Sequence, residues 1–99
     1  MTDISNTALP HGVVNNVSKS RYEIDTGGVL SIADYVIRGD IITFTHTLTP
    51  PQLRGRGIAA RLIHGALEDV KTRGLKVVPA CWFVGEYIQR NPQYRDLLK

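Results

Sequence analysis

The sequence has a single cysteine, Cys81, among its 99 residues. An internal disulfide and a cysteine-rich zinc site are therefore excluded, and the thiol is either a small buried apolar group or a reactive one. No apolar run approaches the roughly 18 residues that span a bilayer. The first residues, MTDISNTALPHG, lack the basic and apolar blocks of a secretory signal. These absences predict a cytoplasmic protein without membrane association.

Positive charge is scarce outside one segment of the chain. The net charge is +3, but segment 52–76 alone carries +4, so the remainder sums to −1. Nucleic-acid-binding proteins usually spread basic residues over a face and interleave aromatic side chains among them. Charge concentrated at one place instead favours a compact anion as the ligand, and makes a nucleic-acid partner the weaker alternative.

The chain is long enough for one domain with a small core. Residues 1–18 are polar and lack sustained periodicity, which predicts a flexible tail before a domain of residues 19–99. Alternating apolar and polar residues then predict three antiparallel strands in SRYEID, VLSIADYVI and IITFTHTL, with turns at TGG and RGD. An open sheet of this size would gain stability from a partner, so a homodimer is one alternative for its assembly.

A helix is predicted after the third strand. Pro50 and Pro51 end the strand pattern, apolar residues recur at helical spacing from Ile58 to Val70, and Gly74 suits the end of a helix. The next segment, LKVVPACWF, is predicted as a strand, so the helix forms a crossover between parallel strands. The predicted fold is α/β (α+β), with a mixed, mostly antiparallel sheet, one βαβ crossover and a C-terminal helix.

The loop before this helix alternates arginine and glycine. A helix N-terminus offers unpaired N–H groups and the positive end of the helix dipole, and Gly55 and Gly57 allow an anion to approach the backbone. The spacing fits neither the Walker A loop nor the dinucleotide-binding motif. The alternative is that the glycines only allow a tight turn and the arginines are solvated.

The segment RGRGIA resembles the Arg/Gln-x-x-Gly-x-Gly/Ala acyl-CoA-binding motif of the GNAT-type N-acetyltransferase superfamily. HTLTP, LRGRGIA, GLKVVPAC and NPQY together resemble the short stand-alone GNAT-like proteins over residues 20–97. The resemblance implies a minimal GNAT-like fold and acetyl-CoA-dependent transfer of an acetyl group to an amine. It also implies a cofactor-binding loop consisting of Arg54, Gly55, Arg56, Gly57, Ile58 and Ala59.

The resemblance places the pantetheine arm between the strands that flank the helix. Pro79 cannot donate a ladder hydrogen bond, so the second strand is expected to part from its neighbour there and leave Cys81 at the opening. Cys81 is either a nucleophile or a wall residue. His46 is the best candidate for a base and is expected on the face of Ile42 and Phe44, although a hydrogen-bonded structural histidine is the alternative.

Two further observations bear on catalysis. Related short proteins usually have a glutamate where this chain has Leu48, so a carboxylate base is missing at that position. Tyr87 is a candidate proton donor to the leaving thiolate, although packing is its alternative role, as it is for Tyr94. Trp82 and Phe83 are expected in the core or along the cleft.

The remaining predictions concern partners. His11 and His64 have no neighbours at metal-ligand spacing, so no metal site is expected. The chain before Arg21 is too short for the elements that shape the amine pocket in full GNAT domains, which implies an open acceptor site for an unidentified amine, with peptides and proteins among the candidates. The alternatives are an acyl-CoA-binding or regulatory domain without turnover and, third, a basic nucleic-acid-associated domain.

Overall fold

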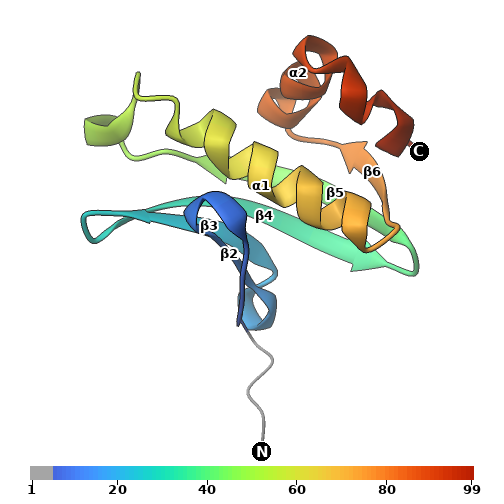
Figure 1. Ribbon diagram of the computed structural model, residues 1–99, viewed down its shortest axis with the longest axis horizontal. Coiled ribbons are helices and arrows are strands. Elements are labelled where there is room, and N and C mark those ends of the chain that lie inside the picture. Colours follow the sequence, from blue (N-terminus) through green and yellow to red (C-terminus); the bar gives the residue numbers. More distant parts are fainter. Residues whose placement is uncertain (1–5) are drawn as a thin grey trace, which may run out of the picture.

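A six-stranded mixed sheet forms the centre of the molecule (Figure 1). The computed structural model describes residues 6–99. The strands lie in the sheet in chain order, and every neighbouring pair is antiparallel except β5 with β6. The predicted mixed sheet with one crossover is therefore confirmed. The strands are β1 (Asn6–Ala8), β2 (Val13–Asn16), β3 (Arg21–Thr26), β4 (Val29–Arg38), β5 (Ile41–Leu48) and β6 (Lys76–Pro79).

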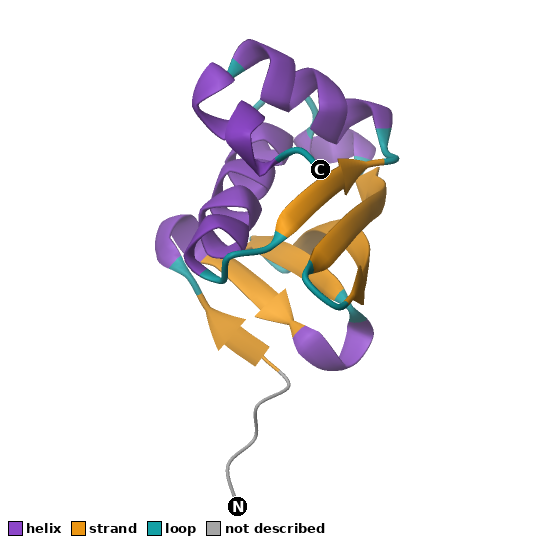
Figure 2. Ribbon diagram, turned by 90° about the vertical axis from the view of Figure 1, so that its right-hand side faces the viewer, coloured by secondary structure: helices purple, strands orange, loops and turns teal. Residues whose placement is uncertain are grey.

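Two α-helices lie against one face of this sheet. Helix α1 (Ile58–Thr72) connects β5 to β6, and α2 (Trp82–Arg90) leads into a 3-10 segment, Pro92–Leu97. Figure 2 shows α1 and α2 gathered on one side of the strands, with a short 3-10 segment apart from them. We call the side opposite the two α-helices the outer face; within residues 6–99 it carries no α-helix, and it includes the exposed side chains of Leu30, Val36 and Leu48.

Within residues 6–99, no helix is both long enough and apolar enough to cross a membrane.

The apolar stripe of α1 forms the centre of the core. Leu62, Ile63 and Leu67 are at most 1% exposed and belong to one buried cluster with Tyr22 and Phe44 of the sheet. Burying one such aliphatic side chain contributes about 1.5–3 kcal/mol. Gly74 follows the helix with φ of 70°, the left-handed conformation expected of it. The periodicity of the sequence therefore identified this helix and the face that it buries.

The prediction of a tail over residues 1–18 was wrong for the part that the structure describes. Strands β1 and β2 extend the sheet beyond β3, and Val13 is 1% exposed in the core. Residues 1–5 lie outside the described residues. The domain therefore includes at least residues 6–18 in addition to residues 19–99.

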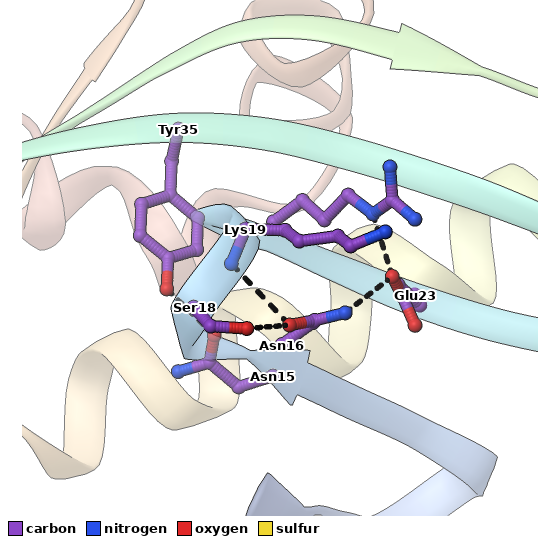
Figure 3. Close-up of polar contacts among 7 residues, drawn as sticks. Asn15, Asn16, Ser18, Lys19, Glu23 and Tyr35 are labelled. Atoms are coloured by element: carbon purple, nitrogen blue, oxygen red, sulfur yellow. Dashed lines mark hydrogen bonds and ion pairs between the residues drawn. The ribbon is translucent and has the colours of Figure 1, made fainter. Parts of the chain in front are cut away.

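Polar side chains hold this N-terminal part in place (Figure 3). The Asn16 side chain accepts hydrogen bonds from the Ser18 hydroxyl and the Lys19 amide and donates one to Glu23. Asn15, 3% exposed, accepts a hydrogen bond of 2.7 Å from the Tyr35 hydroxyl. Buried polar groups with partners are compatible with a folded interior. The asparagines that suggested a tail are thus parts of a hydrogen-bonded structure.

Gly65 of α1 provides a test of this packing. A Cβ at Gly65 would lie 2.5 Å from Cγ2 of Val13 and 2.9 Å from its Cβ. Gly65→Ala is therefore expected to lower the free energy of unfolding by roughly 1–2 kcal/mol, because the overlap exceeds the gain of about 1 kcal/mol in helix propensity. Urea denaturation measures the change.

The control is the same substitution in a Val13→Ala protein. The penalty of Gly65→Ala should then shrink, because the contact of 2.5 Å is removed with Cγ2, whereas the Cβ at position 13 stays 2.9 Å away and keeps part of the penalty. Equal penalties in both backgrounds would mean that Cγ2 of Val13 is not what a side chain at position 65 meets.

Candidate active site

A short loop connects β5 to α1 and is held at both ends. Leu53, in a 3-10 turn at Pro51–Leu53, is 4% exposed and anchors the loop in the core. The Arg54 Nε donates a hydrogen bond of 3.2 Å to the Thr49 carbonyl. Gly55 and Gly57 have φ of 82° and 73°, which residues with a Cβ rarely adopt. The loop conformation therefore depends on glycine at these two positions.

The N-terminus of α1 points unpaired amides out of this loop. Gly57 is the N-cap and has no side chain to cap the helix, and the Arg61 amide makes the first helical bond, 3.0 Å, to the Gly57 carbonyl. The amides of Ile58, Ala59 and Ala60 precede that bond, so helix geometry leaves them without a backbone acceptor. Together with the helix dipole they favour an anion at this position.

A pocket of about 360 Å³ lies at this helix end and reaches β5 and α2. It contains five of the six residues predicted to bind the cofactor, and Arg56 is the one that is not part of the lining. Whether these residues bind a cofactor stays a prediction. The pocket is lined by Thr47, Thr49, Leu53, Arg54, Gly55, Gly57, Ile58, Ala59, Ala60 and Phe83.

Strands β5 and β6 part close to this pocket. Their ladder ends with the pair Phe44 and Pro79, and the Cys81 amide then donates a hydrogen bond of 2.9 Å to the Phe44 carbonyl. Strand β5 continues to Leu48, whereas the segment that follows β6 turns into α2. The predicted strand over LKVVPACWF therefore ends at Pro79, earlier than expected, because proline has no N–H to continue the ladder. We call the opening beyond Pro79 the strand gap.

Cys81 lies beside the strand gap, at the N-cap of α2. Its Sγ is 3.4 Å from the Thr47 hydroxyl, and Thr47 also lines the pocket. Burial raises the pKa of the Cys81 thiol, but hydrogen bonds from the Thr47 hydroxyl and from the amides of Val84 and Phe83 lower it by more, so the net pKa is below its ordinary value. At a given pH a larger fraction of the Cys81 thiol is therefore ionised than in a free cysteine.

A β-bulge in β5 changes the face to which His46 belongs. Tyr35 of β4 pairs with Phe44, but Asp34 pairs with His46, so Thr45 is an extra residue in β5. Beyond Thr45 the alternation is reversed: Thr47 pairs with the buried Ala33 and faces the helices, whereas His46 lies on the outer face. The expectation that His46 shares a face with Ile42 and Phe44 was therefore wrong.

The bulge also separates the two candidate catalytic groups. His46 and Cys81 lie on opposite faces of the sheet at the same strand gap, since Cys81 contacts Thr47 and His46 precedes Thr47 in β5. Leu48, two residues beyond His46, is likewise on the outer face and 44% exposed. The structure therefore brings Cys81 to the pocket side and His46 to the other side.

Tyr87 lies next to the pocket but not beside the thiol. It lines a smaller cavity of about 190 Å³, which shares Ala60 and Phe83 with the larger pocket, and its ring stacks on Tyr94 at 6.1 Å. Burial and the negative charge of Glu68 raise the pKa of Tyr87, which keeps its hydroxyl protonated at neutral pH. No hydrogen bond joins Tyr87 to Cys81 in the described chain. A role as proton donor stays a prediction.

Sequence reasoning missed a buried hydrogen-bonded group on α1. The Tyr94 hydroxyl donates to Glu68 at 2.6 Å and lies 2.9 Å from Nδ1 of His64. Tyr94 is 1% exposed, so the packing role considered for it is confirmed. The four-residue spacing of His64 and Glu68 was a sequence signal that the two share a helix face. Trp82 was expected in the core or along the cleft; it is 74% exposed, so it is not a core residue, and it lines the smaller cavity together with Phe83.

Metal ligation has no visible basis in the described residues. No three histidine, cysteine, aspartate or glutamate side chains in residues 6–99 come together in a way that could hold a metal ion.

Comparison with known protein families matches residues 21–97 to the family described as GCN5-related N-acetyl-transferase. This match extends from β3 to the last 3-10 segment. The chain belongs to the GCN5-related N-acetyltransferase family. As a family member it has a structural relative in the NMR solution structure of a GCN5-like protein from Staphylococcus aureus, with a TM-score of 0.67 at 20% identity, covering 97% of this chain and 91% of the other. At that identity the likeness shows the fold alone.

Among curated proteins, this GCN5-related family member is similar to Protein NATD1 of several vertebrates. The identity is 39% over 61 residues with the mouse protein, covering 60% of this chain and 56% of the relative. The human protein gives 39% with 60% and 54% covered, and the Xenopus tropicalis protein gives 37% with 59% and 55% covered. The chain thus matches about half the length of these relatives.

Proposed function

We propose that this protein is an acetyl-CoA-dependent N-acetyltransferase, in which the pocket at the N-terminus of α1 binds the cofactor and the strand gap is the place of transfer. One observation carries the proposal: a single pocket extends from the unpaired amides of Ile58 and Ala59 to Thr47, which contacts the Cys81 thiol. A pocket with an anion site at the helix N-terminus and with Thr47, the neighbour of the Cys81 thiol, in its lining fits a cofactor that carries a diphosphate and a thioester.

The loop residues fit the diphosphate. A Cβ at Gly55 or Gly57 would meet nothing within 4 Å, so the space beside the backbone is open to a ligand. The amides at the start of α1 supply donors, and the exposed side chains of Arg54 and Arg56 supply positive charge nearby. Leu53 and Phe83 line the pocket with apolar surface suited to the pantetheine arm.

The chain supplies two groups for the chemistry at the strand gap. Acetyl-CoA, when bound, supplies the acetyl group as an activated thioester. Cys81, with its lowered pKa, either accepts the acetyl group as a thiolate or lines the thioester end. His46 lies on the outer face of the same gap, where an amine can approach from solvent and lose its proton. The two faces would then serve the two substrates separately.

Titration calorimetry with acetyl-CoA tests the cofactor site. Gly57→Glu is expected to weaken binding at least tenfold, since the carboxylate introduces negative charge beside the helix amides and disfavours φ of 73°. The matched control is Gly39→Glu in the turn between β4 and β5, because Gly39 also has a positive φ, 63°, but does not line the pocket.

The control separates two effects, because both substitutions strain a left-handed glycine but only one faces the pocket. Binding retained in Gly39→Glu and lost in Gly57→Glu supports the site. No heat with the unaltered protein, or equal affinities in both variants, would contradict it.

Leu48 favours a second candidate, an acyl-CoA-binding domain without turnover. The residue is an exposed leucine on the outer face, where the resemblance to the short GNAT-like proteins implies a glutamate. Release of free CoA with spermidine and a lysine-containing peptide as amine probes distinguishes the two candidates. Binding without amine-dependent release, over a wide panel of amines, would favour the second.

A further inference from the structure

Three charged or titratable side chains form a row across the outer face. Register places Arg21 of β3 opposite Asp34 of β4, and Asp34 opposite His46 of β5. Side chains of directly opposed residues on one face have Cβ atoms about 4.5–5.5 Å apart. Asp34 therefore lies between a guanidinium and an imidazole, and the imidazole end of the row is at the strand gap.

The other carboxylates of this face are already engaged. Glu23 accepts hydrogen bonds from Arg21 and Asn16, and Asp25 accepts one of 2.7 Å from the Gly28 amide. Asp34 is half-buried, and within residues 6–99 its carboxylate has neither a hydrogen bond nor an ion pair. Of the three carboxylates, that of Asp34 alone has no partner within residues 6–99, and since it is not among the buried polar atoms it remains open to water and to a neighbouring side chain.

The bulge fixes the relation between Asp34 and His46. The Thr45 hydroxyl contacts the Asp34 carbonyl at 3.4 Å, so the extra residue is held against β4 at this point. Directly beyond it, His46 faces Asp34 on the outer side and Thr47 faces Cys81 on the pocket side. Successive residues of a strand rise about 3.3 Å. His46, on the outer face, is therefore the neighbour in sequence of Thr47, which contacts the Cys81 thiol on the pocket side.

We propose that Asp34 is a positioning residue for His46. The two side chains are opposed without a hydrogen bond in this structure, and rotation of the exposed His46 side chain would let the carboxylate accept one from a ring nitrogen. That bond would fix the tautomer and leave the other nitrogen free to accept a proton from the acceptor amine. This inference rests on the proposed transferase function and adds a residue to it.

The proposed transfer moves one acetyl group from sulfur to nitrogen and one proton from nitrogen to His46. The nitrogen of the amine forms a bond to the thioester carbon, the carbon–sulfur bond breaks with its electron pair on sulfur, and the proton leaving nitrogen moves to His46. Asp34 stabilises the resulting imidazolium through its negative charge without taking the proton. Arg21 is opposite Asp34 in the register but is itself paired with Glu23, so it competes little for Asp34.

Nitrogen-15 NMR of the imidazoles is the direct test, recorded at alkaline pH on the whole protein. The chain has three histidines, and His46→Gln assigns the signal of His46 by its loss. In the unaltered protein the two ring nitrogens are expected to show one dominant tautomer, and Asp34→Asn should shift the tautomer ratio. The matched control, Asp40→Asn, changes an exposed aspartate in the turn at the far end of the β4–β5 hairpin.

Kinetics supply the second readout. With spermidine and a lysine-containing peptide as amine probes, Asp34→Asn is expected to lower kcat at least about tenfold, to leave the affinity for acetyl-CoA unchanged, and to be partly rescued by Asp34→Glu. Identical His46 signals in Asp34→Asn and the unaltered protein, or an unchanged kcat, would overturn the inference. Failure of the proposed function is distinct, because it appears as loss of acetyl-CoA binding while the tautomer experiment is unaffected.

Discussion

Cys81→Ala is expected to lower the rate of acetyl transfer by about 100-fold or more, with acetyl-CoA affinity changed by no more than about twofold. We expect this loss because the Cys81 thiol contacts Thr47 at the strand gap and because its pKa is below the ordinary value, which favours the thiolate. Cys81 is also the chain's single thiol, so no neighbour can replace it. Release of free CoA measures the rate, and calorimetry measures the affinity.

Two further measurements decide what Cys81 does. If the thiolate accepts the acetyl group, mass spectrometry of the unaltered protein with acetyl-CoA should detect an acetylated form that Cys81→Ala and Cys81→Ser lack. The rate of alkylation by iodoacetamide should rise with pH as the thiolate forms, and the lowered pKa moves that rise to lower pH than for a free cysteine. A Cys81→Ala protein with an undiminished rate would leave Cys81 as a wall of the pocket.

Phe44→Ala is expected to lower the free energy of unfolding by about 3–5 kcal/mol. Phe44 is fully buried, and its ring lies 6.1 Å from that of Tyr22 and 6.5 Å from that of Tyr35. The loss would be a sizeable share of the roughly 5–15 kcal/mol that stabilises a small domain. Urea denaturation followed by circular dichroism measures it.

The control is Val36→Ala, because Val36 is also apolar and on a central strand but is 43% exposed on the outer face. Val36→Ala should lower the free energy of unfolding by less than about 1 kcal/mol. Similar losses for the two variants would mean that the core does not lie between the sheet and α1. Because the Phe44 carbonyl also holds the Cys81 amide, the Phe44 variant should additionally be tested for thiol reactivity at a temperature where it remains folded.

The parts of the fold that the sequence predicted are those specified by local patterns. Strands β3, β4 and β5 alternate strictly over most of their lengths, α1 has apolar residues at helical spacing, and Gly57 and Gly74 mark its ends. Each pattern can be read within about 15 residues. The crossover then follows from the order of elements and the handedness of such connections.

The parts that were missed depend on contacts between distant residues. Strands β1 and β2 contain asparagines whose burial is compensated by partners on other strands, as with Asn15 and Tyr35, and no local pattern shows this. The bulge at Thr45 has no sequence signature either, since IITFTHTL continues to alternate through it. For this reason the loop before α1 was placed correctly in the chain, whereas the face of His46 was not; that the loop binds a cofactor stays a prediction.

The single extra residue at Thr45 determines which side chains of β5 face the helices and which face solvent. In an uninterrupted strand, positions separated by an even number of residues share a side, so Phe44 and His46 would both be enclosed beneath the helices. One inserted residue changes that parity, and the strand that is buried on the helix side through Phe44 presents the next even-numbered side chain to solvent. His46 and Thr47, directly after the bulge, therefore face opposite sides of the sheet, and the part of the chain that the structure describes separates two chemical environments with a single layer of helices.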